Sequence, residues 1–146
     1  MAFRSQRYCA CQLIAAINAR IFLGGKDIAE EDFERLVDET CGRIGSCIGV
    51  EKAYSELGLS FKCGPTSLRW IKRHLPVEIG IRDPKYGFHA VLITAVRGRQ
   101  VRLINGWKRW VSWKTIRGLL PKYDYQRTCK SYAHIHVPMQ EVQTQV

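Results

Sequence analysis

The sequence predicts an α+β fold, with N-terminal helices packed on a mainly antiparallel sheet. Apolar residues recur at helical spacing through the first half of the chain. The second half has short apolar or alternating runs separated by Gly, Asp, Pro and basic residues. The 146 residues are typical of one domain that buries its own core. We expect that domain to cover residues 1–137, followed by a polar, disordered tail over 138–146.

Four helices are expected in the first half. The clearest covers residues 11–23, where Leu13, Ile14, Ile17 and Ile21 recur at helical spacing before Gly24-Gly25 ends the run. The next has acidic residues toward its start, and the last two have a candidate serine or threonine cap and a Gly or Pro stop. These three cover residues 27–39, 46–57 and 67–75.

Six short strands are expected among and after these helices, since their residues are apolar or alternate in polarity. They cover residues 59–61, 77–81, 88–96, 101–105, 110–113 and 132–137.

Composition and charge limit the functional classes. Hydrophobic residues make up 46% of the chain and charged residues 25%, which excludes an intrinsically disordered protein. The 23 Lys and Arg against 13 Asp and Glu give a formal charge of +10, which attracts phosphates, acidic lipids or acidic polypeptides. We find no signal peptide and no apolar run long enough to span a bilayer, and so expect a soluble cytoplasmic protein.

The six cysteines lack the spacing of a zinc site, because the chain has no Cys-x-x-Cys. Without a signal peptide, a disulfide scaffold is disfavoured, so we expect reduced thiols, no metal and no organic cofactor. We interpret His74, His134 and His136 as structural.

Residues suited to nucleophilic cysteine catalysis occur in a suggestive order. Cys9 and Cys11 lie at the start of the first predicted helix, where free amides and the helix dipole lower a thiol pKa. His89 begins an apolar strand, Asn105 ends the next one, and Gln6 precedes Cys11 by five residues. This chemistry needs an imidazole, a group that orients it and an oxyanion donor.

The run Gln6-Arg7-Tyr8-Cys9-Ala10-Cys11 before an Ala/Ile-rich helix, then Phe88-His89-Ala90-Val91-Leu92 and Asn105, resembles the papain-like cysteine peptidases. The similarity is greatest to the bacteriocin-processing, or double-glycine leader, peptidases and their free-standing bacterial or phage relatives. The resemblance implies Cys11 as nucleophile, His89 as general base and acid, Asn105 as the group orienting the imidazole, and Gln6 as oxyanion donor. The implied partner is a peptide or protein substrate.

Several alternatives stay open. Cys9 is a second candidate nucleophile, because the run Ile14-Ala15-Ala16-Ile17 also aligns from it. The same four groups would serve a side-chain deamidase or a transglutaminase-like acyl transferase. A catalytically silent basic module that binds nucleic acid or an acidic partner is the rival from another class. Trp107, Trp110 and Trp113 recur among basic residues, but no nucleic-acid motif accompanies them, and we interpret them as packing residues.

The spacing of His89 and Asn105 contains a geometric test. Strand side chains alternate between faces, so the two residues share a face only if the intervening hairpin loop has an odd length or the strand contains a bulge. We predict a three-residue loop, Arg97-Gly98-Arg99, which places Asn105 opposite Val91.

Overall fold

The computed structural model describes residues 3–5, 10–41, 50–84, 87–106, 108–120 and 130–135. It is an α+β fold, as predicted, with helices followed by one six-stranded antiparallel sheet in the order β1-β6-β2-β3-β4-β5. The helices are α1 (Cys11–Phe22), α2 (Glu30–Thr40), α3 (Glu51–Glu56), α4 (Leu68–Arg73) and α5 (Trp113–Gly118). The strands are β1 (Leu59–Cys63), β2 (Val77–Asp83), β3 (Gly87–Arg97), β4 (Gln100–Ile104), β5 (Trp110–Ser112) and β6 (Lys130–Ile135).

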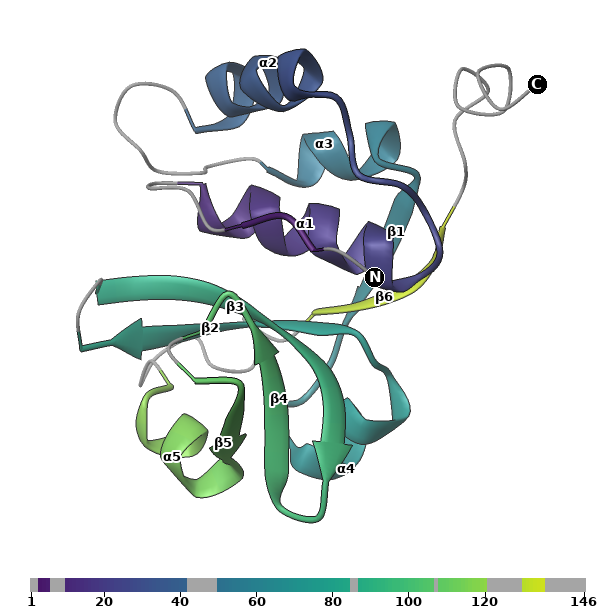
Figure 1. Cartoon of the computed structure of the whole chain (residues 1–146). Coiled ribbons are helices and arrows are strands. Elements are labelled where there is room, and N and C mark those ends of the chain that lie inside the picture. Colours follow the sequence, from purple (N-terminus) through teal and green to yellow (C-terminus); the bar gives the residue numbers. More distant parts are fainter. Residues whose placement is uncertain are drawn as a thin grey trace.

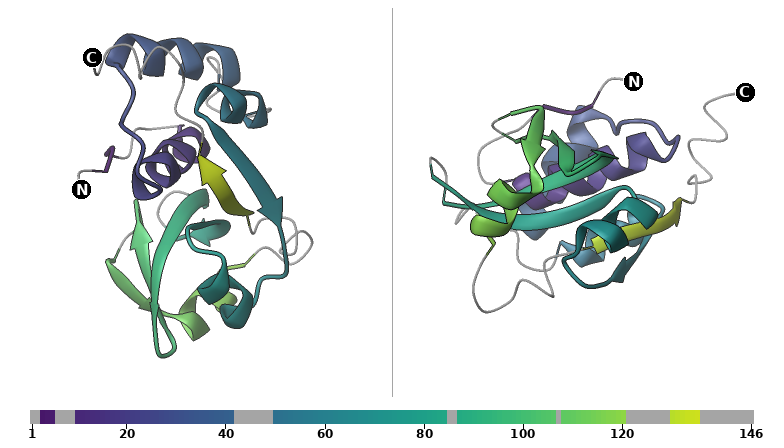
Figure 2. Two further views of the ribbon diagram at one scale, coloured as in Figure 1. Left: turned by 90° about the vertical axis from the view of Figure 1, so that its right-hand side faces the viewer. Right: turned by 90° about the horizontal axis from the view of Figure 1, so that it is seen from below.

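The sheet separates two groups of helices. Figure 1 shows α1 lying along β2 and β3, with α2 and α3 stacked beyond it, while α4 and α5 lie at the other end of the molecule. The left view in Figure 2 agrees, with the purple and blue helices above the green strands. The N-terminus of α1 therefore meets the sheet at the boundary between the two parts.

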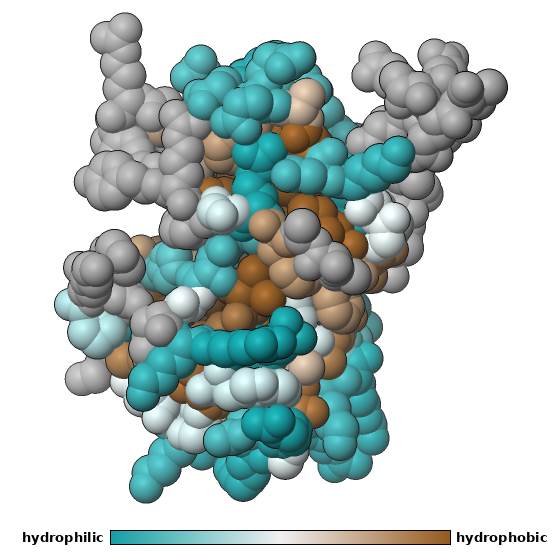
Figure 3. Space-filling model, viewed as in Figure 1, coloured by the Kyte–Doolittle hydropathy of each residue, from teal (hydrophilic) through white to brown (hydrophobic). Residues whose placement is uncertain are grey.

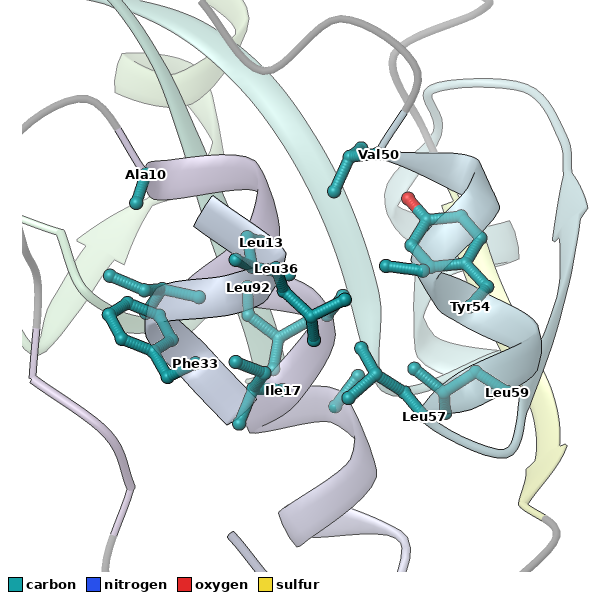
Figure 4. Close-up of a cluster of buried hydrophobic side chains, with 14 of the residues drawn as sticks. Ala10, Leu13, Ile17, Phe33, Leu36, Val50, Tyr54, Leu57, Leu59 and Leu92 are labelled. Atoms are coloured by element: carbon teal, nitrogen blue, oxygen red, sulfur yellow. The ribbon is translucent and has the colours of Figure 1, made fainter. Parts of the chain in front are cut away.

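Strand β3 is buried on both faces because its side chains alternate between two cores. Leu92 belongs to the core formed with α1, α2 and α3, whereas Val91 and Ile93 belong to the core formed with α4, α5, β4 and β5. Figure 4 shows Leu92 among Leu13, Ile17 and Leu36. One strand thus joins both halves of the fold.

The β3–β4 hairpin reaches the expected register by a different route. Arg97 pairs with Gln100, so the loop has two residues, Gly98 and Arg99, and the prediction of three was wrong. The register then shifts between Ile93 and Ala95, where a bulge adds one residue to β3. Leu92 consequently pairs with Ile104, the same register that a three-residue loop would produce. The bulge supplies the odd count that places His89 and Asn105 on the same face of the sheet.

One helix escaped prediction. Residues 110–113 were expected to be a strand, but β5 ends at Ser112 and Trp113 begins α5. The side chain of Ser112 caps α5 by accepting a hydrogen bond from the Thr115 N–H at 3.2 Å. Trp113 is buried, which agrees with a packing role, and Trp110 is half-buried; Trp107 lies outside the described residues.

The expectation of reduced thiols was wrong for Cys41. This cysteine follows α2, is 5% exposed and is disulfide-bonded, while Cys11 and Cys63 are free. Sequence spacing alone could not reveal this pairing, because a disulfide depends on proximity in the folded chain. No helix in the described ranges is long and apolar enough to cross a membrane.

The helical part is held together by a buried cation. Arg20 of α1 is 1% exposed, and its guanidinium donates hydrogen bonds to the carbonyls of Lys26 at 2.7 Å and Leu57 at 2.8 Å. These bonds connect α1 with the segment before α2 and with the end of α3.

We expect Arg20→Leu to lower the free energy of unfolding by about 2–4 kcal/mol, because the buried carbonyl of Leu57 and the partly buried carbonyl of Lys26 lose their donor. Urea denaturation followed by circular dichroism measures this loss. Arg35→Leu is the control, since Arg35 forms exposed ion pairs with Asp32, Glu39 and Glu56. Equal losses in the two variants would contradict the structural role of Arg20.

Candidate active site

Cys11 is the first residue of α1, at the point where this helix meets β3. The N-cap residue is Ala10, whose side chain does not cap the helix, and the first turn carries no acidic residue. The positive end of the helix dipole is therefore available to a thiolate at this position. Cys11 is a free, partly exposed thiol.

Two residues near the start of β3 contact the Cys11 thiol. The N–H of Ala90 donates a hydrogen bond to Cys11 Sγ at 3.5 Å, and the side chain of His89 makes a second hydrogen bond to Cys11. His89 is 5% exposed, so its ring lies in a largely dry environment. The structure thus brings together two residues, Cys11 and His89, that are far apart in the sequence.

Asn105, the third residue predicted for the site, contacts His89 through its main chain. His89 Nε2 lies 2.6 Å from the backbone carbonyl oxygen of Asn105. A carbonyl oxygen only accepts hydrogen bonds, so Nε2 carries the proton and Nδ1 is left to face the thiol. The contact therefore sets the tautomer in which the imidazole accepts the Cys11 proton.

The Asn105 side chain was expected to orient the imidazole, and the structure assigns that contact to the carbonyl instead. Asn105 follows β4 with a φ of +64°, a left-handed conformation that Asn tolerates better than most residues. The next residue must be small, because a Cβ at Gly106 would lie 2.7 Å from Leu103 Cδ1. The Asn105-Gly106 turn aims the carbonyl at His89.

Burial would by itself raise the pKa of the Cys11 thiol, because it penalises the thiolate. The hydrogen bonds from His89 and the Ala90 N–H, together with the positive charge of His89, outweigh burial and lower that pKa below its ordinary value. The negative charge of Glu78 acts in the opposite sense. The net effect favours the thiolate that nucleophilic catalysis requires.

Glu78 was not identified from the sequence. It lies in β2, is 3% exposed and pairs with Leu92, which places its side chain on the face of the sheet that α1 covers. The available signal was a lone carboxylate within the apolar run Val77-Glu78-Ile79. Its effect on the Cys11 pKa makes it part of the electrostatic surroundings of the site.

Phe88 was also missed as a neighbour of the site. It directly precedes His89 and is 54% exposed, and a Cβ at Gly80 would lie 2.8 Å from its ring. Glycine at position 80 lets this aromatic ring lie on the sheet surface, on the same face as Ala90. The ring is thus an exposed apolar group on the face of the sheet that also carries Ala90 and Leu92.

Two predicted site residues, Gln6 and the alternative nucleophile Cys9, lie outside the described residues, as does His136. His74 has a structural setting, since its ring stacks on Trp70 at 4.2 Å and its Nδ1 lies 2.7 Å from the Trp70 carbonyl. His134 is in β6, but its side chain is not described. Over the described ranges, no three His, Cys, Asp or Glu side chains are grouped as a metal site.

No protein-family model matches the chain, and no curated protein matches it significantly. The function is therefore inferred from the site itself.

The lowered pKa of Cys11 has a measurable consequence. We expect its alkylation by iodoacetamide to persist below pH 8.5, which is about the ordinary thiol pKa, and to fall only as the pH drops through the lower folded-state value. In His89→Ala, the midpoint should move upward, because burial remains while the hydrogen bond and positive charge are lost. Mass-spectrometric peptide mapping measures both profiles, with Cys63 as the reference thiol in each sample. Coincident Cys11 profiles in the wild type and in His89→Ala would refute the pairing of Cys11 with His89.

A second prediction separates the main chain of Asn105 from its side chain. Asn105→Gly retains the carbonyl and accepts a positive φ, so Cys11 alkylation near pH 6 should stay close to that of the wild type. Asn105→Val disfavours this conformation, and we expect a loss of about tenfold, which is the value of one weakened hydrogen bond to a charged group. If Gly and Val lose reactivity equally, the side chain orients His89.

Proposed function

We propose that this protein is a thiol hydrolase that cleaves a peptide or amide bond through an acyl-enzyme, with a papain-like arrangement of its helical and sheet parts. The observation that carries the proposal is the chain of contacts from Cys11 through His89 to the Asn105 carbonyl at the N-terminus of α1. Nucleophile, base and orienting group occur there in the order that this chemistry needs.

The first step is attack of the Cys11 thiolate on the substrate carbonyl carbon. His89 holds the thiol proton on Nδ1, while the Asn105 carbonyl accepts a hydrogen bond from Nε2–H and stabilises the imidazolium. The backbone amide of Cys11 begins α1 and has no intrahelical acceptor, so it is suited to donate to the developing oxyanion. Gln6 is the second donor that the resemblance implies.

Collapse of the tetrahedral intermediate breaks the carbon–nitrogen bond. His89 donates its proton to the leaving amine, and Cys11 remains as a thioester. In the second half of the reaction, His89 accepts a proton from water, which attacks the thioester, and the regenerated imidazolium reprotonates the thiolate. The carboxylic acid product then leaves the enzyme, and one of its oxygens comes from water.

The product of the second step separates hydrolysis from its two chemical rivals. In a peptidase, water hydrolyses an acyl-enzyme formed from the main chain and produces a new C-terminus. In a deamidase, water hydrolyses an acyl-enzyme formed from an Asn or Gln side chain and produces Asp or Glu. In a transglutaminase-like enzyme, an amine replaces water and produces a cross-link. Incubation of a peptide library in H₂¹⁸O distinguishes them, because only the first places ¹⁸O at a new C-terminus.

We expect new ¹⁸O-labelled C-termini with the wild-type protein and a loss of at least about a hundredfold in Cys11→Ala and His89→Ala. Cys63→Ser is the matched control, because Cys63 is free and exposed in β1, away from the site. Labelled Asp and Glu without cleavage would assign a deamidase. Products that persist in Cys11→Ala would overturn the proposal.

A further inference from the structure

The segment from 87 to 120 has an extreme charge composition. It contains seven Lys and Arg and no Asp or Glu: Arg97, Arg99, Arg102, Lys108, Arg109, Lys114 and Arg117. None of these side chains forms an ion pair with a carboxylate in the described parts of the chain, unlike Arg4 and Arg35. The segment therefore concentrates positive charge that would attract an external anion.

Strand pairing gathers part of this charge on one face of the sheet. Arg97 pairs with Gln100, and Arg102 pairs with both Ala95 and Trp110, so Arg97, Arg102 and Trp110 share a face. The opposite face carries Val96, Val101 and Val111, the last two of which belong to the core shared with α4 and α5. We call Arg97, Gln100, Arg102, Trp110 and Ser112 the arginine patch.

An aromatic stack lies at the centre of the arginine patch. The guanidinium of Arg97 reaches across β4, so that its Cζ lies 4.1 Å from the centroid of the Trp110 ring, and its Nη2 donates to Gln100 Oε1 at 3.3 Å. A guanidinium stacked on an indole offers a flat, charged outer face. Arg102 lies on the strand that Arg97 crosses, and its Nε is buried without a hydrogen-bond partner among the described groups.

An anion would reduce the charge repulsion within this arrangement, because Arg97 and Arg102 are cross-strand diagonal neighbours of like charge. Most of the arginine patch is open, since Arg97, Gln100 and Ser112 are exposed and Arg102 and Trp110 are half-buried. On the face seen in Figure 3, strongly hydrophilic side chains lie over the β3 to β5 region.

We propose that the arginine patch binds single-stranded nucleic acid. The two guanidinium groups provide phosphate contacts, and the Arg97–Trp110 stack provides a planar surface for an unpaired base. An acidic polypeptide would use the charge but not the stacking surface. The inference does not depend on the thiol chemistry, because no residue of the arginine patch belongs to the Cys11 site.

The test is fluorescence anisotropy of a fluorescein-labelled dT12 oligonucleotide with the full chain, titrated at several salt concentrations. We expect binding that weakens with salt, and a double variant Arg97→Gln/Arg102→Gln that binds at least about tenfold more weakly. Its salt slope should fall by about 1.4, since each lost phosphate contact to a single strand removes about 0.7. Cys11→Ala should bind like the wild type.

The matched control is Lys72→Gln/Arg73→Gln, which removes the same charge from exposed positions of α4. Trp110→Phe should retain binding and Trp110→Leu should lose several-fold, because only the first keeps a ring for stacking. Equal losses in the two double variants, or no binding at low salt, would overturn the proposal. Competition by a 12-residue polyglutamate as effective as that by unlabelled dT12 would assign the arginine patch to an acidic polypeptide instead.

Discussion

The burial of β3 on both faces is the constraint on which the rest of the structure depends. Its alternation sends Leu92 into the core beneath α1 and sends Val91 and Ile93 into the core beneath α4 and α5. Neither core can form without this strand, so the two halves of the molecule meet along it. His89 and Ala90 lie near the start of β3, and the helix that packs on this strand begins with Cys11. The packing that builds the fold therefore also assembles the candidate active site.

The bulge between Ile93 and Ala95 divides β3 into two parts that pair with β4 in different registers. Before the bulge, the register with β4 carries the chain to Asn105 at the level of His89. After it, the register shifts by one residue and aligns Arg97, Gln100, Arg102 and Trp110 on a single exposed face. One extra residue thus sets the register of the candidate active site on one side and of the arginine patch on the other. Bulges often re-aim side chains near functional sites, and this one lies between two candidate sites.

Local signals predicted most of the fold, and interactions between distant segments account for what they missed. Gly24 and the Ser67 cap, which accepts a hydrogen bond from Trp70 N–H, define the ends of α1 and α4 close to where the sequence indicated. The helix α5 escaped because Trp113 was assigned to the strand and Ser112 was not recognised as a helix cap. The two-residue hairpin loop and the Cys41 disulfide depend on backbone geometry and proximity, which periodicity does not encode. Cys11, His89 and Asn105 were nevertheless placed in the right neighbourhood by their positions at element ends.

The Asn105 contact explains why the interpretation of that residue from the sequence was incomplete. As a turn former, Asn105 adopts a positive φ before Gly106, and as a site residue it was expected to use its side chain. In the structure the turn itself performs the site role, because its conformation directs the carbonyl to His89 Nε2. An amide carbonyl is a neutral acceptor whether it belongs to the main chain or to an Asn side chain, so the electrostatic contribution to the imidazolium is alike in kind. The main-chain version needs a residue that tolerates this backbone conformation rather than a particular functional group. Its geometry therefore depends on the Asn105-Gly106 turn and on the register of β4, and through them on the bulge in β3.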